Sequence, residues 1–174
     1  MSEQIFDLLV IGAGPGGYVA AIRAAQLGFN VGVIEQRETL GGVCLNEGCI
    51  PSKALLESSE RFEQACHGLE EHGVDVDSPR LNLSRMMERK QGIIDKLTGG
   101  IAGLFKKNNI SHFHGTGQLL ESNGKTHKVQ VNQPEGQKEL QTKNILLATG
   151  SRAAELPHIP FDGDLVFSAR EALS

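Results

Sequence analysis

The sequence is poor in aromatic residues, with no tryptophan, one tyrosine and seven phenylalanines among 174 residues. It has only three cysteines, an odd number that does not fit the disulfide scaffold of a small secreted protein. No apolar run approaches the roughly 20 residues that a membrane-spanning helix needs. The first apolar run, residues 8–11, is too short for the core of a signal peptide. We therefore expect a cytoplasmic protein without a membrane partner.

Neither sign of charge is in large excess. A net charge of −4 gives no reason to expect nucleic acid or an acidic membrane surface as a partner. The hydrophobic content of 39% and charged content of 22% are typical of a soluble globular protein. The length suits one domain or slightly more. Glycine, in contrast, is abundant, with 21 residues that gather largely in tight clusters.

The first glycine cluster has the spacing of a dinucleotide-binding loop. Gly12, Gly14 and Gly17 fit G-x-G-x-x-G between an apolar segment, 5–11, and an alanine-rich segment, 18–27. These flanking patterns predict a buried parallel strand and a helix. In such a loop the three glycines permit a tight turn, a close approach to a pyrophosphate and close helix–strand packing. The start of the helix adds free N–H groups and partial positive charge.

An acidic residue stands where this kind of loop requires one. Glu35 lies 21 residues after Gly14, at the end of a second predicted strand over 30–34. A carboxylate there accepts hydrogen bonds from ribose hydroxyls and repels a 2′-phosphate, which disfavours NADP at this site. The alternative is a plain glycine turn with Glu35 as an ordinary surface charge.

The sequence places Cys44 and Cys49 five residues apart, directly after a second glycine cluster. Five residues of ideal helix rise roughly 7.5 Å, whereas disulfide Cα atoms lie within about 7 Å of each other. A bridge therefore needs an irregular turn, which Gly48 and Pro51 permit. A helix that starts near Pro51 would favour a thiolate at Cys49. We predict a reversible redox disulfide.

Other interpretations of these residues remain open. A zinc site needs about four ligands, and only Cys66 and scattered histidines are left to supply them, so no metal is predicted. Two inert thiols are a further alternative. Cys66, beside Ala65 in a helical pattern over 52–67, is predicted to be a buried core thiol. Lys53 is either a surface lysine or a cation on the helical face of Cys49.

The remaining patterns predict an α/β fold. Apolar residues three and four apart over 81–108 indicate a long amphipathic helix. Three short strands over 112–120, 127–131 and 139–147, with turns at 123–124 and 133–136, predict a small antiparallel meander from about 112 to 142. Residues 151–174 have no clear period and a possible helix start at Ser168.

The segment 41–53 as a whole, Gly-Gly-Val-Cys-Leu-Asn-Glu-Gly-Cys-Ile-Pro-Ser-Lys, resembles the active-site motif of the FAD-dependent pyridine nucleotide–disulfide oxidoreductases. Its Leu-Asn and Ile-Pro-Ser-Lys version resembles the dihydrolipoamide dehydrogenase branch more than the glutathione or mercuric reductases. The likeness extends to 12–25, 86–107, 115–117 and 148–151. It implies a Rossmann-like FAD-binding domain over 1–150 and a connection, 151–174, towards an NAD-binding domain that the sequence lacks.

The resemblance also implies roles for single residues. Cys44 would be the interchange thiol that meets the dithiol substrate, Cys49 would lie against the flavin, and Lys53 would sit near its N5 atom. The residues implied to contact FAD are Gly12, Gly14, Gly17, Glu35, Gly42, Val43, Cys44, Lys53, Gly117, Thr149 and Gly150. Val43 departs from the usual threonine of the family and removes a hydroxyl beside the cofactor.

The function that the resemblance implies is NAD⁺-dependent oxidation of dihydrolipoamide carried by a lipoyl domain, within a 2-oxo acid dehydrogenase complex. A full-length member would be a homodimer whose interface domain supplies a catalytic histidine–glutamate pair. The sequence contains no such domain, and none of its six histidines is given a catalytic role. The alternatives are a truncated FAD-binding module without turnover and a glutathione- or mercuric-type reductase.

Overall fold

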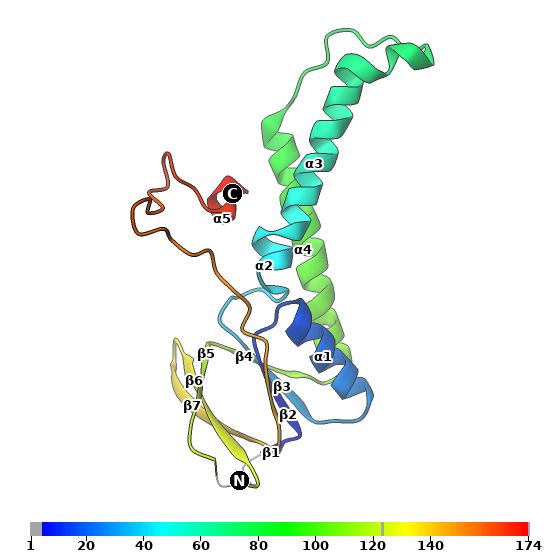
Figure 1. Ribbon diagram of the computed structural model, residues 1–174. Helices are drawn as coiled ribbons and strands as arrows, with labels where there is room; N and C mark the ends of the chain where they lie inside the picture. Colours follow the sequence, from blue (N-terminus) through cyan, green and yellow to red (C-terminus); the bar gives the residue numbers. More distant parts are fainter. Residues whose placement is uncertain (1–4, 123, 174) are drawn as a thin grey trace.

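The structure, a computed structural model that describes residues 5–122 and 124–173, contains two four-stranded sheets at the base of a long helical hairpin (Figure 1). The first sheet has the order β4-β3-β2-β8, with every pair parallel. Its strands are β2 (Leu8–Ile11), β3 (Val31–Glu35), β4 (Ser111–His114) and β8 (Ile145–Leu147). All five residues of the central strand β3 are buried, as expected for a parallel sheet covered on both faces. The predicted α/β class is confirmed.

The second sheet contains the predicted meander, with different limits. Strands β5 (Thr116–Leu119), β6 (His127–Gln133) and β7 (Gly136–Thr142) pair antiparallel, and β1 (Ile5–Phe6) adds to β7 in parallel. The prediction that the meander starts at residue 112 is wrong, because β4 belongs to the parallel sheet. Gly115, at φ +147°, separates β4 from β5. The turn predicted at 123–124 lies partly outside the described residues.

The single strand predicted over 5–11 is also wrong, because Asp7 divides it into β1 and β2 in different sheets. The Asp7 carboxylate accepts a hydrogen bond from the backbone N–H of Asn30 at 2.9 Å and forms an ion pair with Lys143 at 2.7 Å. These polar contacts draw the chain out of the apolar layer for one residue. The backbone therefore passes from one sheet to the other at Asp7.

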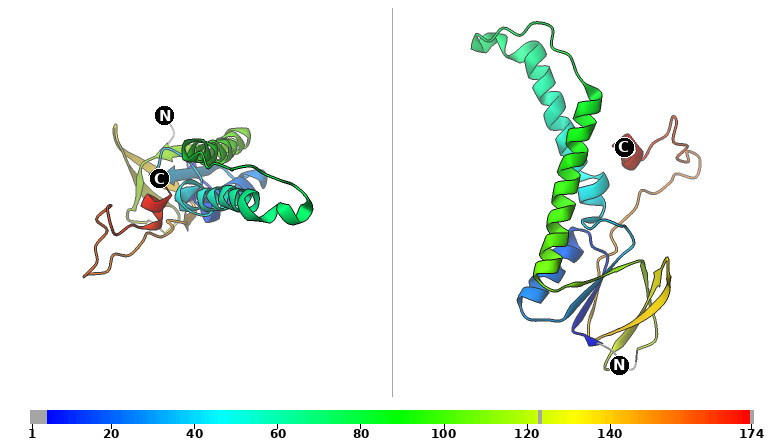
Figure 2. Two further views of the ribbon diagram at one scale, coloured as in Figure 1. Left: turned by 90° about the horizontal axis from the view of Figure 1, so that it is seen from above. Right: turned by 180° about the vertical axis from the view of Figure 1, so that it is seen from behind.

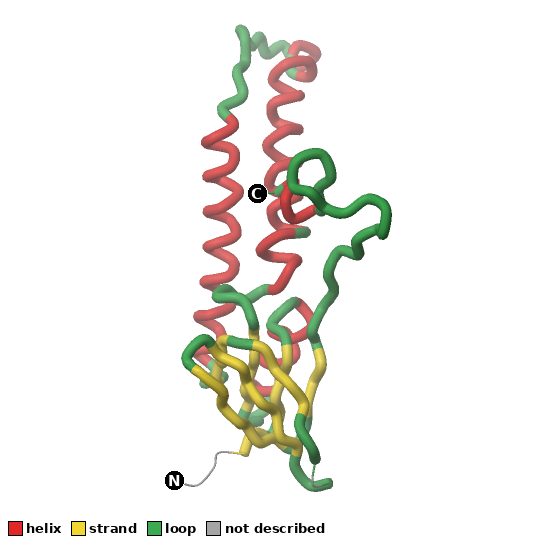
Figure 3. The backbone as a smooth tube through the Cα atoms, turned by 90° about the vertical axis from the view of Figure 1, so that its left-hand side faces the viewer, coloured by secondary structure: helices red, strands yellow, loops and turns green. Residues whose placement is uncertain are grey.

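The helices form one packed layer and one projecting hairpin. Helix α1 (Pro15–Gln26) covers the parallel sheet, and two short turns, η1 (Gln64–Gly68) and η2 (Glu70–His72), form the tip of the hairpin. Its two arms, α3 (Cys49–Glu63) and α4 (Leu83–Lys107), lie side by side and extend away from the sheets (Figures 2 and 3). The buried residues of α4 recur at helical spacing and confirm the predicted amphipathic helix: Lys90, Ile94, Thr98, Ile101 and Phe105.

Two apolar clusters make up the core. The first lies between the parallel sheet and the helices and includes Val10, Val33 and Phe105. The second fills the space between the two sheets and includes Phe6, whose ring meets that of Phe113 edge-on at 5.8 Å. The parallel sheet is thus covered on both faces by apolar side chains.

The C-terminal part of the described chain leaves the sheets after β8 and runs as an irregular segment back towards the hairpin (Figure 1). It ends in the short helix α5 (Ala169–Ala172), which Ser168 caps together with Glu171, as the sequence predicts. The division of the chain at residue 150 stays a prediction. Within the described residues, no helix is both long and apolar enough to cross a membrane.

Candidate functional site

The glycine loop joins the end of β2 to the start of α1. A Cβ atom on Gly17 would lie 1.8 Å from the carbonyl oxygen of Gly12, so the helix can pack this close to the loop only with glycine there. Gly12 has φ +99°, and a Cβ atom on it would lie 2.2 Å from the carbonyl oxygen of Ala148. A Cβ atom on Gly14 would lie 3.9 Å from the Cα atom of Gly42 and would meet no other atom within 4 Å. The backbone at Gly14 is therefore open to a ligand.

Glu35 is buried, with 5% of its surface exposed, and its carboxylate binds the loop directly. The N–H of Ala13 donates to its Oε2 at 2.7 Å, and the N–H of Arg37 donates to its Oε1 at 3.0 Å. This arrangement excludes the alternative of Glu35 as a solvated surface charge. The side chain both fixes the loop and presents a carboxylate at the end of β3.

A cleft of about 910 Å³ opens at the carboxyl ends of the parallel strands, within the size range of ligand pockets, about 300–1,000 Å³. Ligands of open parallel sheets bind at this edge. Nine of the residues expected at the cofactor line the cleft: Gly12, Gly14, Glu35, Gly42, Val43, Cys44, Gly117, Thr149 and Gly150. Gly17 lies behind the loop, and Cys49 and Lys53 are exposed residues of α3 outside the lining.

The two cysteines belong to different helices. Cys44 lies in the six-residue helix α2 (Gly42–Glu47), which the sequence did not predict, and Cys49 begins α3. The predicted irregular turn is present at Gly48, where φ is −140° and ψ is −112°. The helix predicted from residue 52 therefore starts at Cys49. Pro51 fits in its first turn because the N–H groups there have no partner within the helix.

Both thiols are free in this structure, and they face each other. A hydrogen bond with the Cys49 side chain, followed by burial, raises the pKa of the Cys44 thiol, and the nearby Lys53 ammonium opposes that rise. Cys44 is half-buried, whereas Cys49 is exposed at the start of α3. Cys49 is thus the first residue of α3, where the N–H groups of the first turn have no partner within the helix.

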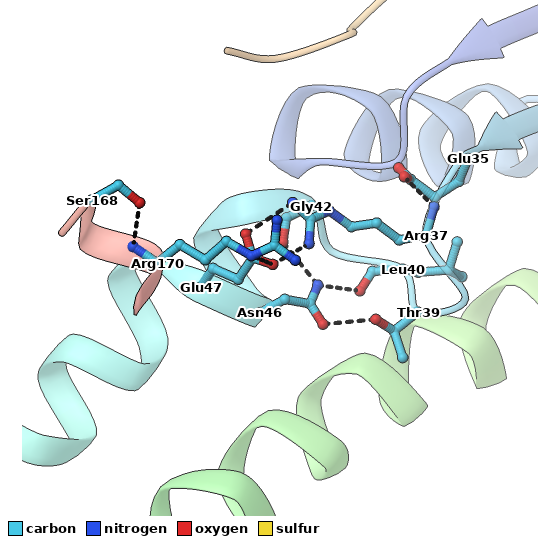
Figure 4. A network of polar contacts seen from close by, with 9 residues as sticks. All are labelled: Glu35, Arg37, Thr39, Leu40, Gly42, Asn46, Glu47, Ser168 and Arg170. Carbon is cyan, nitrogen blue, oxygen red and sulfur yellow. Dashed lines mark hydrogen bonds and ion pairs between the residues drawn. The ribbon is translucent and has the colours of Figure 1, made fainter. Parts of the chain in front are cut away.

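A polar network that the sequence did not predict surrounds α2 (Figure 4). Asn46 donates to the carbonyl oxygens of Leu40 and Gly42 at 3.2 Å and 2.8 Å and accepts the Thr39 hydroxyl at 2.7 Å. Arg37 binds Glu47 through two parallel bonds, Nη1 to Oε1 at 2.6 Å and Nη2 to Oε2 at 2.9 Å. These bonds connect α2 to the loop that follows β3.

Two further cysteine-related predictions have different outcomes. Cys66 is half-buried in the π-helical turn η1, so its prediction as a buried core thiol is wrong. The end of α3 projects beyond the core, which leaves that thiol partly open. Among the described residues, no group of three or more His, Cys, Asp or Glu side chains is placed to hold a metal ion.

The fold and cleft define a class: an α/β dinucleotide-binding protein with a thiol pair beside its cleft. The model of the pyridine nucleotide-disulphide oxidoreductase family matches residues 6–172. The chain belongs to that family. FAD is the cofactor of the family, and the open backbone at Gly14 and the buried carboxylate of Glu35 fit a dinucleotide of this kind.

Curated relatives of the chain include mitochondrial dihydrolipoyl dehydrogenases. The human protein is 49% identical over 170 residues, which cover 97% of this chain and 33% of the human protein. The protein from Sus scrofa is 50% identical over 171 residues, with the same shares covered. The chain thus spans about one third of the length of these relatives.

Solved structures with the same fold include LpdA from Mycobacterium tuberculosis, with a TM-score of 0.84 at 24% identity over 95% of this chain and 36% of that one. The HOCl-induced flavoprotein disulfide reductase RclA from Escherichia coli has a TM-score of 0.71 at 26% identity. That match covers 88% of this chain and 30% of RclA. This chain therefore shares its fold with part of LpdA and with part of a flavoprotein disulfide reductase.

Proposed function

We propose that this chain is the FAD-binding, dithiol-bearing part of an enzyme that oxidises dihydrolipoamide with NAD⁺. The observation that carries the proposal is the meeting of Cys44 and Cys49 beside a cleft headed by the glycine loop. The relatives at 49% and 50% identity are dihydrolipoyl dehydrogenases, which supports this substrate. NAD⁺ would be bound by a portion of the protein beyond this chain.

The lining of the cleft would hold the cofactor. Gly12, Gly14 and Gly17 would hold the pyrophosphate, and Glu35 would accept the adenosine ribose hydroxyls. Gly117, Thr149 and Gly150 come from two other strand ends and would close over the same molecule. Val43 is 45% exposed and lines the cleft, so the hydroxyl of the usual threonine is replaced by an apolar surface.

The cysteines would carry out two thiol–disulfide exchanges. From the oxidised state, a thiolate of the substrate attacks the Cys44 sulfur, the Cys44–Cys49 bond breaks, and Cys49 leaves as a thiolate. The second substrate thiol, as its thiolate, attacks the sulfur bound to Cys44, releases the cyclic disulfide and leaves Cys44 as a thiolate. Bound FAD supplies the electron acceptor for this reduced pair and the donor of hydride to NAD⁺. Lys53 would keep a positive charge beside the thiolates.

The wider setting belongs to the same proposal. The expected partners are a lipoyl domain of a 2-oxo acid dehydrogenase complex and a second copy of the full-length protein. The sequence favours a cytoplasmic location, whereas the named dihydrolipoyl dehydrogenase relatives are mitochondrial. A different candidate is an FAD-binding module without turnover.

Reconstitution with FAD tests the cofactor site, with two neighbouring glycines as a matched pair. Gly17→Ala places a methyl group against the Gly12 carbonyl, whereas a Cβ atom on Gly16 meets nothing within 4 Å. We expect Gly17→Ala to lower FAD affinity at least tenfold and Gly16→Ala to leave it unchanged, measured by flavin fluorescence, with circular dichroism as the folding check. Equal FAD affinity in the two variants would contradict the cofactor site.

Dithiol-dependent NAD⁺ reduction tests the substrate. Dihydrolipoamide should support turnover by the full-length protein, and glutathione should not. Replacement of either Cys44 or Cys49 by serine should abolish turnover of dihydrolipoamide. Turnover by the 174-residue chain alone would exclude the inactive-module candidate, and full activity of both serine variants would refute the proposed mechanism.

A further inference from the structure

Glu47 lies between the two cysteines in the sequence, and its carboxylate lies between two guanidinium groups in space (Figure 4). Arg37 binds both of its oxygens, at 2.6 Å and 2.9 Å, and the Nε atom of Arg170 lies 3.1 Å from Oε1. The Glu47 side chain is only 18% exposed. A bidentate arginine–carboxylate pair has a fixed geometry, so this contact restricts orientation as well as distance.

The position of this charge is unfavourable for α2 itself. Glu47 is the last residue of α2, and a carboxylate at the C-terminal end of a helix is repelled by the helix dipole. No local feature of α2 therefore explains a glutamate there. The two arginines do explain it, and the hydrogen bond from Arg37 holds the pKa of the Glu47 carboxyl below its usual range. The negative charge of Glu47 is therefore paired with groups outside α2.

The first of these contacts leads to the dinucleotide loop. The backbone N–H of Arg37 donates to Glu35, and the other oxygen of Glu35 accepts the N–H of Ala13 in the glycine loop. The Arg37 side chain then reaches Glu47. The loop expected to hold the cofactor and the helix that carries Cys44 are thus connected through three consecutive links, the last of which consists of two parallel hydrogen bonds.

The second contact leads to the C-terminal helix. Arg170 belongs to α5, and the Nζ atom of the buried Lys90 in α4 donates to the carbonyl oxygen of Leu173 at 2.5 Å. Helix α5 is therefore held at two points, one on α4 and one on α2. Because Arg170 sits on a segment fixed elsewhere, it can restrain Glu47 instead of following its movements.

We propose that Glu47 is a positioning residue for the Cys44–Cys49 pair. Arg37 and Arg170 hold its carboxylate, the carboxylate holds α2, and α2 keeps the Cys44 sulfur opposite Cys49 across the Gly48 break. This inference rests on the proposed function in that it takes the two cysteines as a redox pair. Loss of the restraint lowers the effective concentration of one thiol at the other, which makes the disulfide easier to reduce.

Equilibration with glutathione measures this effect without any lipoamide. Two protein thiols and one glutathione disulfide give the Cys44–Cys49 disulfide and two glutathione thiols, so atoms and electrons balance. We expect Glu47→Gln in the full-length protein to lower this equilibrium constant about tenfold, which corresponds to about 30 mV. The oxidised fraction is read by alkylation of the remaining thiols and mass spectrometry.

The chain offers a matched control in Glu57, which also lies between two arginines, Arg61 at 2.8 Å and Arg89 at 2.6 Å. The contact with Arg89 joins α3 to α4, the contact with Arg61 lies within α3, and neither involves α2. Glu57→Gln makes the same change of charge and should leave the equilibrium constant within twofold of the parent protein. A shift in Glu57→Gln equal to that in Glu47→Gln would overturn the proposal, since the effect would then be general.

A second variant, Arg170→Gln, tests the proposal if Glu47→Gln does not fold. Arg170 is 66% exposed, so Arg170→Gln leaves the core intact, and it should lower the equilibrium constant in the same direction and add nothing in the Glu47→Gln background. An unchanged constant in folded Glu47→Gln, or in Arg170→Gln if Glu47→Gln is unfolded, would overturn the positioning role. A parent protein that forms no disulfide in the glutathione buffer would instead refute the proposed function.

Discussion

The segment before residue 148 and the segment after residue 150 are held to the molecule in different ways. Every buried hydrophobic side chain of the described residues lies between Phe6 and Leu140, and all of them except Ala54 and Ile94 belong to the two apolar clusters. Within 151–173 no described residue is buried. That segment depends on Arg170 with Glu47, Lys90 with Leu173, and the cap at Ser168. Apolar burial maintains the first region, and charges and polar caps maintain the second.

The largest expected difference between these regions comes from the same truncation made in each. Leu9 is fully buried, whereas Leu165 is 84% exposed. Leu9→Ala should lower the free energy of unfolding by about 2–5 kcal/mol, because it removes apolar contacts and leaves a cavity. Leu165→Ala should change it by less than about 0.5 kcal/mol. Urea titration measures both, and similar losses would contradict the comparison.

A smaller and local effect is expected at the cap of α5. Ser168 accepts the N–H of Arg170 at 3.2 Å and donates to the Glu171 carboxylate. Ser168→Ala should destabilise α5 by about 1 kcal/mol, which makes tryptic cleavage after Arg170 roughly fivefold faster. The melting temperature of the core should not change. A fall in that temperature would show that 151–173 contributes to the core after all.

The smallest effect should come from salt and acid. Because Arg170 is largely exposed, 1 M NaCl should screen its pair with Glu47 and raise hydrogen exchange in α5 about twofold. The pKa of Glu47 is lowered, so its pairing is present above the ordinary titration range of glutamate and is lost progressively as pH falls through and below that range. Exchange in β2 and β3 should not respond to salt, and an equal response there would contradict the comparison.

Sequence alone predicted the features that depend on local pattern. The glycine loop, the strand ending at Glu35, the long helix α4, the irregular turn at Gly48 and the helix start at Ser168 are all present. Each of these features depends on residues close together in the sequence, through glycine spacing, apolar periodicity or a helix cap. Nine of the residues expected at the cofactor line the cleft, and they too were identified from short motifs of neighbouring residues.

What sequence alone missed depends on contacts between distant residues. The break at Asp7 requires Asn30 and Lys143 as partners. Helix α2 is short and glycine-flanked, so it has no helical periodicity to detect. The role proposed for Glu47 requires Arg170, which lies 123 residues later in the sequence.

The pairing of the strands has a consequence for synthesis on the ribosome. Leu9 in the central strand β2 pairs with Ile145, and Ile5 in β1 pairs with Gln141. The first two strands therefore have partners that lie 136 residues later in the sequence, a topology of high contact order that slows folding. Until residue 147 emerges, one edge of β2 has unpaired N–H and C=O groups. A nascent chain paused between β7 and β8 should thus be the species that a chaperone protects.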